Sequence, residues 1–249
     1  NKVAFTGSTA VGRAIAKSVA GSGKKLTLEL GGKAANIVFD DAPIDQAVEG
    51  IVNGIFFNQG HVCCAGSRLL VQENVHDEVV DRLKLRLSTL RLGDPLDKNT
   101  DIGAINSREQ LERIRELSDI GEREGAERWT APCVIPDKGF WFAPTIFTNV
   151  STSSTIAREE IFGPVLAVIR FKTEAEAIAM ANDSAYGLQA SVWSDNVNRA
   201  HRVARALRAG TVHVNQYDED DITVPFGGFK QSGVGRDKSL HAFDKYTET

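Results

Sequence analysis

Residues 165–214 read VLAVIRFKTEAEAIAMANDSAYGLQASVWSDNVNRAHRVARALRAGTVHV, and apolar runs alternate with amphipathic segments along them. The runs at 165–171, 190–193 and 211–214 are rich in β-branched and aromatic residues, which favours strands. Helices are predicted around 174–182 and 196–209, between these strands. A repeated order of strand and then helix is typical of parallel sheets. We therefore predict an α/β fold with substantial parallel pairing.

The same alternation extends toward the N-terminus. A strand is predicted over 3–6 and leads into a helix in which Val11, Ile15 and Val19 recur at helical spacing. Further strands are predicted over 25–30, 35–39, 67–72 and 140–147, and further helices over 42–57, 75–90 and 108–124. Pro144 suits an edge or an irregular end of its strand.

Composition excludes several classes of function. The 249 residues are 42% hydrophobic, which is enough for a sizeable core. A net charge of −4 with scattered Lys and Arg argues against nucleic-acid binding. No apolar run reaches the length that spans a membrane. Three cysteines, two of them adjacent, form no disulfide framework, so we expect a reducing, cytoplasmic environment.

Two glycine-flanked segments contain the candidate catalytic groups. Cys63 lies between Gly60 and Gly66, where the backbone can approach a ligand closely, and Glu29 precedes a glycine pair at the end of a predicted strand. Taken singly, such a cysteine is most often a small buried hydrophobe and such a glutamate a surface residue. Together they suggest a thiolate nucleophile and a carboxylate that activates water.

Five motifs occur in order along the chain, and together they resemble the aldehyde dehydrogenase superfamily. They are FTGST, ELGGK, FFNQGHVCCAGSR, EEIFGPV and PFGGFKQSG, and the resemblance runs over the whole chain. It implies that Cys63 is the nucleophile and Glu29 the general base. It also implies that a thioester forms on Cys63 and is then hydrolysed to the carboxylic acid.

The resemblance further implies NAD or NADP as the cofactor. Glu160 would hold the nicotinamide ribose, and Phe162 would flank the nicotinamide. Gly7 and Ser8 stand at a strand, turn and helix junction that can bind an anion, although such small residues are commonly just a connection. The resemblance makes them cofactor contacts, together with Gly31. No metal site is expected.

Residues 215–221 read NQYDEDD and occupy the position of the family's substrate-entrance loop. Four consecutive carboxylates repel one another unless they are solvated or paired, and a solvated acidic loop is one interpretation. The other interpretation is that the loop attracts an aldehyde with an amino or guanidino group at its far end. The residues concerned would be Asp218, Asp220, Asp221 and Phe226. The tail over 224–245 also resembles the subgroup that acts on γ-aminobutyraldehyde derivatives.

The resemblance predicts three parts of the chain: a remnant of the dinucleotide-binding domain over 1–31, a catalytic domain over 32–232, and a C-terminal helix over 233–249 that returns toward the cofactor domain. We expect a fragment, because the chain opens on a strand and the family's second oxyanion donor would precede it. The fragment alone is then expected to be inactive, and the full-length form to be a homo-oligomer.

Three side chains near or beyond the thiol need separate interpretation. His61 replaces the glutamine more usual in the family. A protonated histidine close to the thiol would depress its pKa. We favour a tolerated substitution, because neighbouring residues of an extended loop point apart. Cys64 and Cys133 are interpreted as structural.

Two other functions stay open. A CoA-acylating relative would pass the thioester to a thiol, but such members typically lack the glutamate at position 29. A non-catalytic binding or assembly module is the other alternative.

Overall fold

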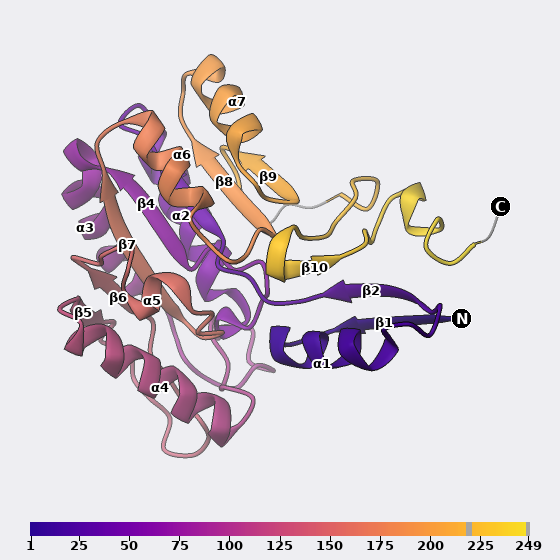
Figure 1. Cartoon of the computed structure of the whole chain (residues 1–249). Coiled ribbons are helices and arrows are strands. Elements are labelled where there is room, and N and C mark those ends of the chain that lie inside the picture. Colours follow the sequence, from indigo (N-terminus) through magenta and orange to yellow (C-terminus); the bar gives the residue numbers. More distant parts are fainter. Residues whose placement is uncertain (218–220, 248–249) are drawn as a thin grey trace.

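The structure is a computed structural model, and it describes residues 1–217 and 221–247. Among these residues, seven strands form one large sheet in the order β5-β6-β7-β4-β3-β8-β9 (Figure 1). All neighbours are parallel except β5 and β6. The strands are β3 (Ala35–Val38), β4 (Arg68–Gln72), β5 (Glu127–Thr130), β6 (Thr145–Thr148), β7 (Val165–Phe171), β8 (Gln189–Trp193) and β9 (Thr211–Val214). The predicted α/β fold with parallel pairing is confirmed.

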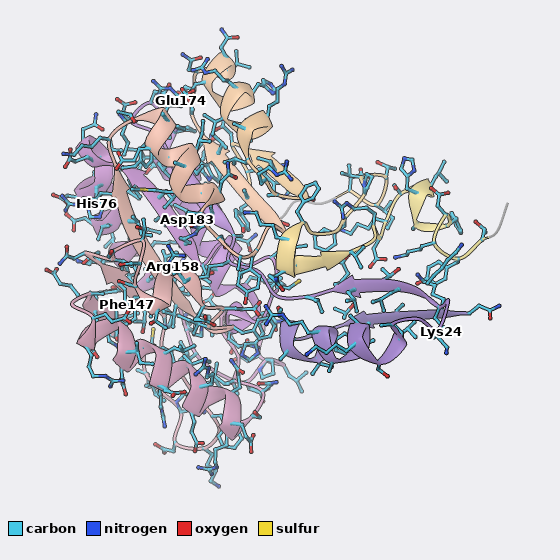
Figure 2. The ribbon with its side chains drawn as sticks, viewed as in Figure 1. Lys24, His76, Phe147, Arg158, Glu174 and Asp183 are labelled. Atoms are coloured by element: carbon cyan, nitrogen blue, oxygen red, sulfur yellow. The ribbon has the colours of Figure 1, made fainter. Side chains whose placement is uncertain are left out.

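Helices cover both faces of this sheet, so its central strands are buried on both sides and read as continuous apolar runs. On one face, α4 (Arg108–Arg123), α6 (Glu174–Asn182) and α7 (Val197–Ala206) pack against alternate strand residues such as Ile37 and Ile169. On the other face, α2 (Ile44–Phe56) and α3 (His76–Leu87) pack against Val38 and Val168. Phe147 of β6, labelled in Figure 2, is fully buried in the cluster on the α4, α6 and α7 face.

Local capping explains where the helices after β7 and β8 begin. Thr173 accepts a hydrogen bond from the backbone N–H of Glu176 and caps α6. Asn196 accepts from the N–H of Arg199 and caps α7 in the same way. Each cap satisfies an N–H that the first turn of a helix leaves unpaired, so each strand passes into its helix at a defined residue.

A second, smaller sheet lies to one side of the large one (Figure 1). It contains β1 (Lys2–Thr6), β2 (Lys25–Glu29) and β10 (Gly233–Val234), with β1 parallel and β10 antiparallel to β2. The helix α1 (Thr9–Val19) connects β1 to β2. The late segment thus returns to the early one, and the Ser232 hydroxyl donates to the Gly31 carbonyl at 2.8 Å.

The C-terminal helix predicted over 233–249 is not seen in the described residues. That segment contains β10 and one 3-10 turn, Leu240–Ala242. Gly233, Gly235, Lys238 and Ser239 all have positive φ angles, which a right-handed helix excludes.

Two smaller differences concern strands. The strand predicted over 140–147 begins at Thr145, after Pro144, and β5 was not predicted. The predicted boundary at 31–32 lies between β2 and β3, where the chain passes from the small sheet to the large one. Over 1–217 and 221–247, no helix has the length and apolar character that crossing a bilayer requires.

Candidate active site

The candidate site forms where three neighbouring strands of the large sheet begin. Gly31 and Gly32 precede β3, Cys63 precedes β4, and Glu160 precedes β7. Because β3, β4 and β7 are adjacent and parallel, their amino ends meet at one edge of the sheet. Glu29, at the carboxyl end of β2, reaches the same edge from the small sheet. The topology therefore brings together the thiol and both predicted carboxylates.

The glycine pair at 31 and 32 allows these segments to touch. A Cβ added at Gly32 would collide with the backbone carbonyl of Cys63, and one added at Gly31 would collide with the Glu160 carboxylate. The Gly32 N–H also donates to Glu160 Oε1 at 3.0 Å. Any larger residue at these positions would push the thiol loop or the carboxylate away.

Cys63 is half-buried, and its surroundings favour the thiolate. A hydrogen bond with the Cys64 side chain lowers the pKa of the Cys63 thiol below its ordinary value, with a further contribution from a backbone hydrogen bond to Cys64. Burial and the charges of Glu160 and Glu29 act in the opposite direction but do not outweigh it. Since both carboxylates act on the thiol, the predicted nucleophile and its predicted base lie within electrostatic reach of each other.

Glu29 is suited to accept a proton near neutral pH. It is 5% exposed, and neither carboxylate oxygen has a hydrogen-bond partner among the described residues. Burial raises the pKa of Glu29 to about 7, although Lys245 and Arg236 partly oppose this rise. A carboxyl group with a pKa near the working pH meets the requirement for general base catalysis.

Glu160 and Phe162 lie on a segment that the surrounding structure fixes. Arg158, at the end of α5 (Thr155–Arg158), forms an ion pair with Asp183 at 2.8 Å (Figure 2). The Gln110 side-chain amide donates to the carbonyls of Ile161 and Phe162 at 3.0 and 2.9 Å. Burial raises the pKa of Glu160, while the Gly32 hydrogen bond and the Lys33 charge lower it.

His61 has a contact that the sequence did not predict. Its ring stacks on Phe162 with 5.3 Å between centroids and 2° between planes. Burial lowers the pKa of His61, so the ring is mainly neutral at pH 7. A protonated His61 therefore does not account for the lowered pKa of Cys63. The stack forms because the 159–164 segment packs back onto the thiol loop, and that His61 is a tolerated substitution stays a prediction.

The turn at Gly7 and Ser8 lies beside the same glycine pair. Ser8 caps α1 by accepting from the Val11 N–H at 3.3 Å, and the Gly7 N–H donates to the Glu29 carbonyl at 3.0 Å. A Cβ at Gly31 would also lie 3.1 Å from Thr9 Oγ1. The turn, Gly31 and Glu160 thus lie close together, and their contact with a cofactor stays a prediction.

The structure supports the predicted substrate residues less than it supports the thiol and the two carboxylates. Asp218 and Asp220 lie outside the described residues. Asp221 is exposed, and its Oδ1 accepts from the N–H and hydroxyl of Thr223 at 2.8 and 2.7 Å. Phe226 is half-buried, and its backbone exchanges two hydrogen bonds with Asp237. The Asp221 carboxylate is thus engaged by its own turn.

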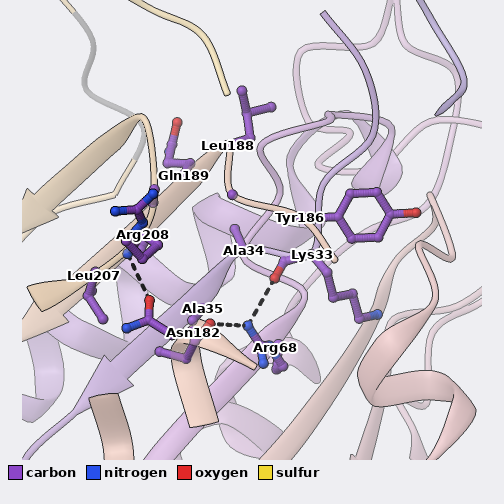
Figure 3. A pocket seen from close by; sticks show the side chains of 14 residues that line it. Lys33, Ala34, Ala35, Arg68, Asn182, Tyr186, Leu188, Gln189, Leu207 and Arg208 are labelled. Atoms are coloured by element: carbon purple, nitrogen blue, oxygen red, sulfur yellow. Dashed lines mark hydrogen bonds between the residues drawn. The ribbon is translucent and has the colours of Figure 1, made fainter. Parts of the chain in front are cut away.

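Lys33 is a site residue that sequence reasoning missed, although it directly follows the glycine pair. It is 2% exposed, and its Nζ has no hydrogen-bond partner among the described residues. Burial and, to a smaller extent, Arg68 lower the pKa of Lys33 to about 7, against the influence of Glu160 and Glu159. It also lines a small cavity of about 20 Å³ (Figure 3) with other polar side chains, among them Arg68, Asn182, Tyr186, Gln189 and Arg208.

Comparisons with known proteins agree with this geometry. The aldehyde dehydrogenase family model matches residues 1–249. The chain is 48% identical over 248 residues to a putative aldehyde dehydrogenase, DhaS, of Bacillus subtilis (strain 168). This match covers 100% of the present chain and 50% of that relative. It is 46% identical over 252 residues to the NADP/NAD-dependent aldehyde dehydrogenase PuuC of Escherichia coli (strain K12). That match covers 99% of the present chain and 50% of PuuC.

A solved structure gives the same result. The chain superposes with a TM-score of 0.96 and 48% identity on a mutant of AldA, an indole-3-acetaldehyde dehydrogenase of P. syringae, solved in complex with NAD+. The match covers 99% of this chain and 51% of that one. The chain thus spans about half the length of the relatives it matches. On the family match, the level of identity and the shared fold, this chain belongs to the aldehyde dehydrogenase family.

Proposed function

We propose that this chain carries the catalytic thiol and base of an NAD+- or NADP+-dependent aldehyde dehydrogenase, which oxidises an aldehyde to a carboxylic acid. The main support is the convergence of Cys63, Glu29 and Glu160 at one edge of the sheet, with the pKa of the thiol lowered and that of Glu29 raised to about 7. These are the properties that a nucleophile and a general base need at neutral pH.

The residues present fit a nicotinamide cofactor. One Glu160 oxygen is held by the Gly32 N–H, and a carboxylate engaged in this way retains acceptor sites for ribose hydroxyls. Gly31 keeps the space beside that carboxylate free of a side chain. A nicotinamide bound beside these residues would supply the acceptor for a hydride from the substrate carbon.

The residues of this chain then act in order. The Cys63 thiolate attacks the aldehyde carbon, and the backbone N–H of Cys63 donates to the oxyanion that forms. Once the hydride has left, the substrate carbon is held as a thioester on Cys63. Glu29 takes a proton from water as that water attacks the thioester, and the C–S bond breaks to release the acid and the thiolate.

Residues 1–249 alone are expected to lack this activity. By resemblance to the family, a second oxyanion donor and the groups that grip the adenosine ribose lie outside them. The choice between NAD+ and NADP+ would then depend on residues elsewhere in the full-length protein. A homo-oligomeric, cytoplasmic form also stays a prediction.

For the substrate, we propose an aldehyde with a cationic amino or guanidino group at its far end. The four carboxylates at 218–221 support this, although Asp221 is engaged with Thr223. The test compares kcat/KM for an aminobutyraldehyde and an uncharged aldehyde of equal length at two salt concentrations. A preference for the amine that weakens with salt supports the proposal, and equal, salt-insensitive values contradict it.

The reaction itself is tested in the full-length protein by following reduction of NAD+ and NADP+ at 340 nm with a panel of aldehydes. Cys63→Ser should reduce turnover by at least about 10³-fold, because the hydroxyl is a far weaker nucleophile. Cys133→Ser is the matched control and should leave turnover within about twofold, since the Cys133 thiol donates to the Leu90 carbonyl and Cys133 is not one of the proposed site residues. Turnover that survives Cys63→Ser would refute the assignment.

Two alternatives make different predictions. A CoA-acylating enzyme would form a CoA thioester and depend on added CoA, whereas Glu29, with its raised pKa, favours hydrolysis. A non-catalytic module would have an inert Cys63 thiol. A thiol reagent separates that alternative from the enzyme, because only an activated cysteine reacts fast at neutral pH.

A further inference from the structure

Tyr217 connects the acidic segment to the thiol loop, although it lies 153 residues from its partner in the sequence. It directly precedes the carboxylates at 218–221. Its side chain is 3% exposed, and its hydroxyl donates to the backbone carbonyl of Cys64 at 2.6 Å. That carbonyl belongs to the residue next to the proposed nucleophile.

Two glycines shape the slot that holds the Tyr217 ring. A Cβ at Gly54 would lie 2.6 Å from Cδ1 of Tyr217, and one at Gly66 would lie 2.9 Å from its Cζ. The two glycines are themselves joined, because the Gly66 N–H donates to the Gly54 carbonyl at 2.9 Å. The ring therefore fits a slot between α2 and the thiol loop, and it cannot shift without disturbing both.

Cys64 is the neighbour with the largest influence on the pKa of the Cys63 thiol. Its side chain provides the largest influence that lowers the pKa of the Cys63 thiol, and its backbone provides a further one. Burial, Glu160 and Glu29 all act against this lowering. A small displacement of Cys64 would leave the opposing influences in place and weaken the favourable one, because hydrogen bonds depend steeply on distance and angle.

We propose that Tyr217 is a positioning residue, which holds Cys64 by its carbonyl and thereby keeps the Cys63 thiol reactive. This inference rests on the proposed function, since it assigns Tyr217 a part in the same site. It also gives the 215–221 segment a physical route to the thiol, because a change in that segment that moves Tyr217 also moves Cys64.

The test replaces Tyr217 by phenylalanine, which retains the ring and removes only the donor. The rate of Cys63 alkylation by iodoacetamide is measured from pH 5 to pH 10, and peptide mass spectrometry separates Cys63 from Cys64 and Cys133. We expect the midpoint of the profile to rise and alkylation at pH 7 to slow by about fivefold, because the thiolate fraction falls. Tyr246→Phe is the matched control, since Tyr246 is 64% exposed, and it should leave the profile unchanged.

A second variant reaches the same hydrogen bond from the other side. In Gly66→Ala, the added methyl group displaces the Tyr217 ring, and we expect a shift of the midpoint in the same direction. In a Cys64→Ala background, Tyr217→Phe should add little, because a residue that acts through Cys64 loses its effect when that side chain is absent.

The outcomes separate this inference from the proposed function. If the unsubstituted protein shows a low midpoint and Tyr217→Phe leaves it unchanged with an unchanged circular dichroism spectrum, the inference is wrong and the nucleophile stands. If the unsubstituted protein itself shows an ordinary thiol midpoint, Cys63 is not activated, and both fail. A shift with Tyr217→Phe, and none with Tyr246→Phe, supports the inference.

Discussion

The edge of the sheet that holds Cys63 and the acidic segment that follows β9 differ in how packing fixes them. At the sheet edge, Gly31 lies against the Glu160 carboxylate and Gly32 against the Cys63 carbonyl, so a single added methyl group would push these segments apart. Beyond Tyr217, Asp221 is exposed and bonded to its own turn. The comparison teaches that the proposed catalytic groups are fixed by close packing, whereas Asp221, the described carboxylate of the proposed selectivity segment, is held only by its own turn.

The largest effect is expected at the glycine pair. In Gly32→Ala, the new Cβ collides with the Cys63 carbonyl, and we expect a loss of about 2–4 kcal/mol in the free energy of unfolding, measured in urea. Gly103→Ala is the control, because its Cβ would first meet the flexible end of Gln59 at 3.2 Å. Equal stability of the two variants would show that the sheet edge is not tightly packed.

The next effect concerns the pH dependence of stability at Glu29. Its pKa is 4.5 unfolded and about 7 folded, so its contribution is fully present below pH 4.5 and is lost as the pH rises through 7. Between pH 4.5 and 8.5 the unsubstituted protein should therefore lose up to about 3 kcal/mol relative to Glu29→Gln. Urea unfolding of both proteins at the two pH values measures this difference. An equal change in the free energy of unfolding of the two proteins would contradict the claim that the Glu29 carboxylate is buried without a hydrogen-bond partner.

A smaller effect is expected where His61 stacks on Phe162. His61→Leu should reduce stability by about 0.5–1.5 kcal/mol, because it removes a stacked ring pair. Independently, the His61 ring protons should lie upfield in the proton NMR spectrum and move downfield in Phe162→Leu. Unshifted ring protons in the unsubstituted protein would mean that the two loops are not in contact.

The smallest effect is expected in the acidic segment. Asp221→Asn should change the free energy of unfolding by less than about 0.5 kcal/mol, because the exposed carboxylate makes only local hydrogen bonds. A thermal melt checks this value. A loss above 1 kcal/mol would mean that the segment is packed and that the contrast with the sheet edge is wrong.

Sequence patterns predicted the convergence of the site better than its supporting contacts. Cys63, Glu29 and Glu160 stand in locally distinctive, glycine-containing segments, and the order of strands and helices implied a parallel sheet. The Tyr217 contact could not be predicted, because it joins segments 153 residues apart and neither pattern indicates the other. Lys33 was not predicted as a site residue, because a lysine usually lies at the surface, whereas this one is buried.

The error at the C-terminus has a local cause. A helix was expected over 233–249 by resemblance, but Gly233 and Gly235 take positive φ angles and direct the chain into β10 beside β2. This pairing matters for the site, because it brings Arg236 and Lys245 close enough to Glu29 to oppose the rise in its pKa.

The most direct test of the central claim is the intact mass of full-length Glu29→Gln protein after mixing with an aldehyde and NAD+. Cys63 should still attack the aldehyde, while hydrolysis should be slowed by about 10²–10⁴-fold without the base. We predict that the acyl group accumulates as a thioester on the peptide that contains Cys63 and disappears on treatment with hydroxylamine. The absence of an adduct, or an acyl group on another residue, would contradict the account.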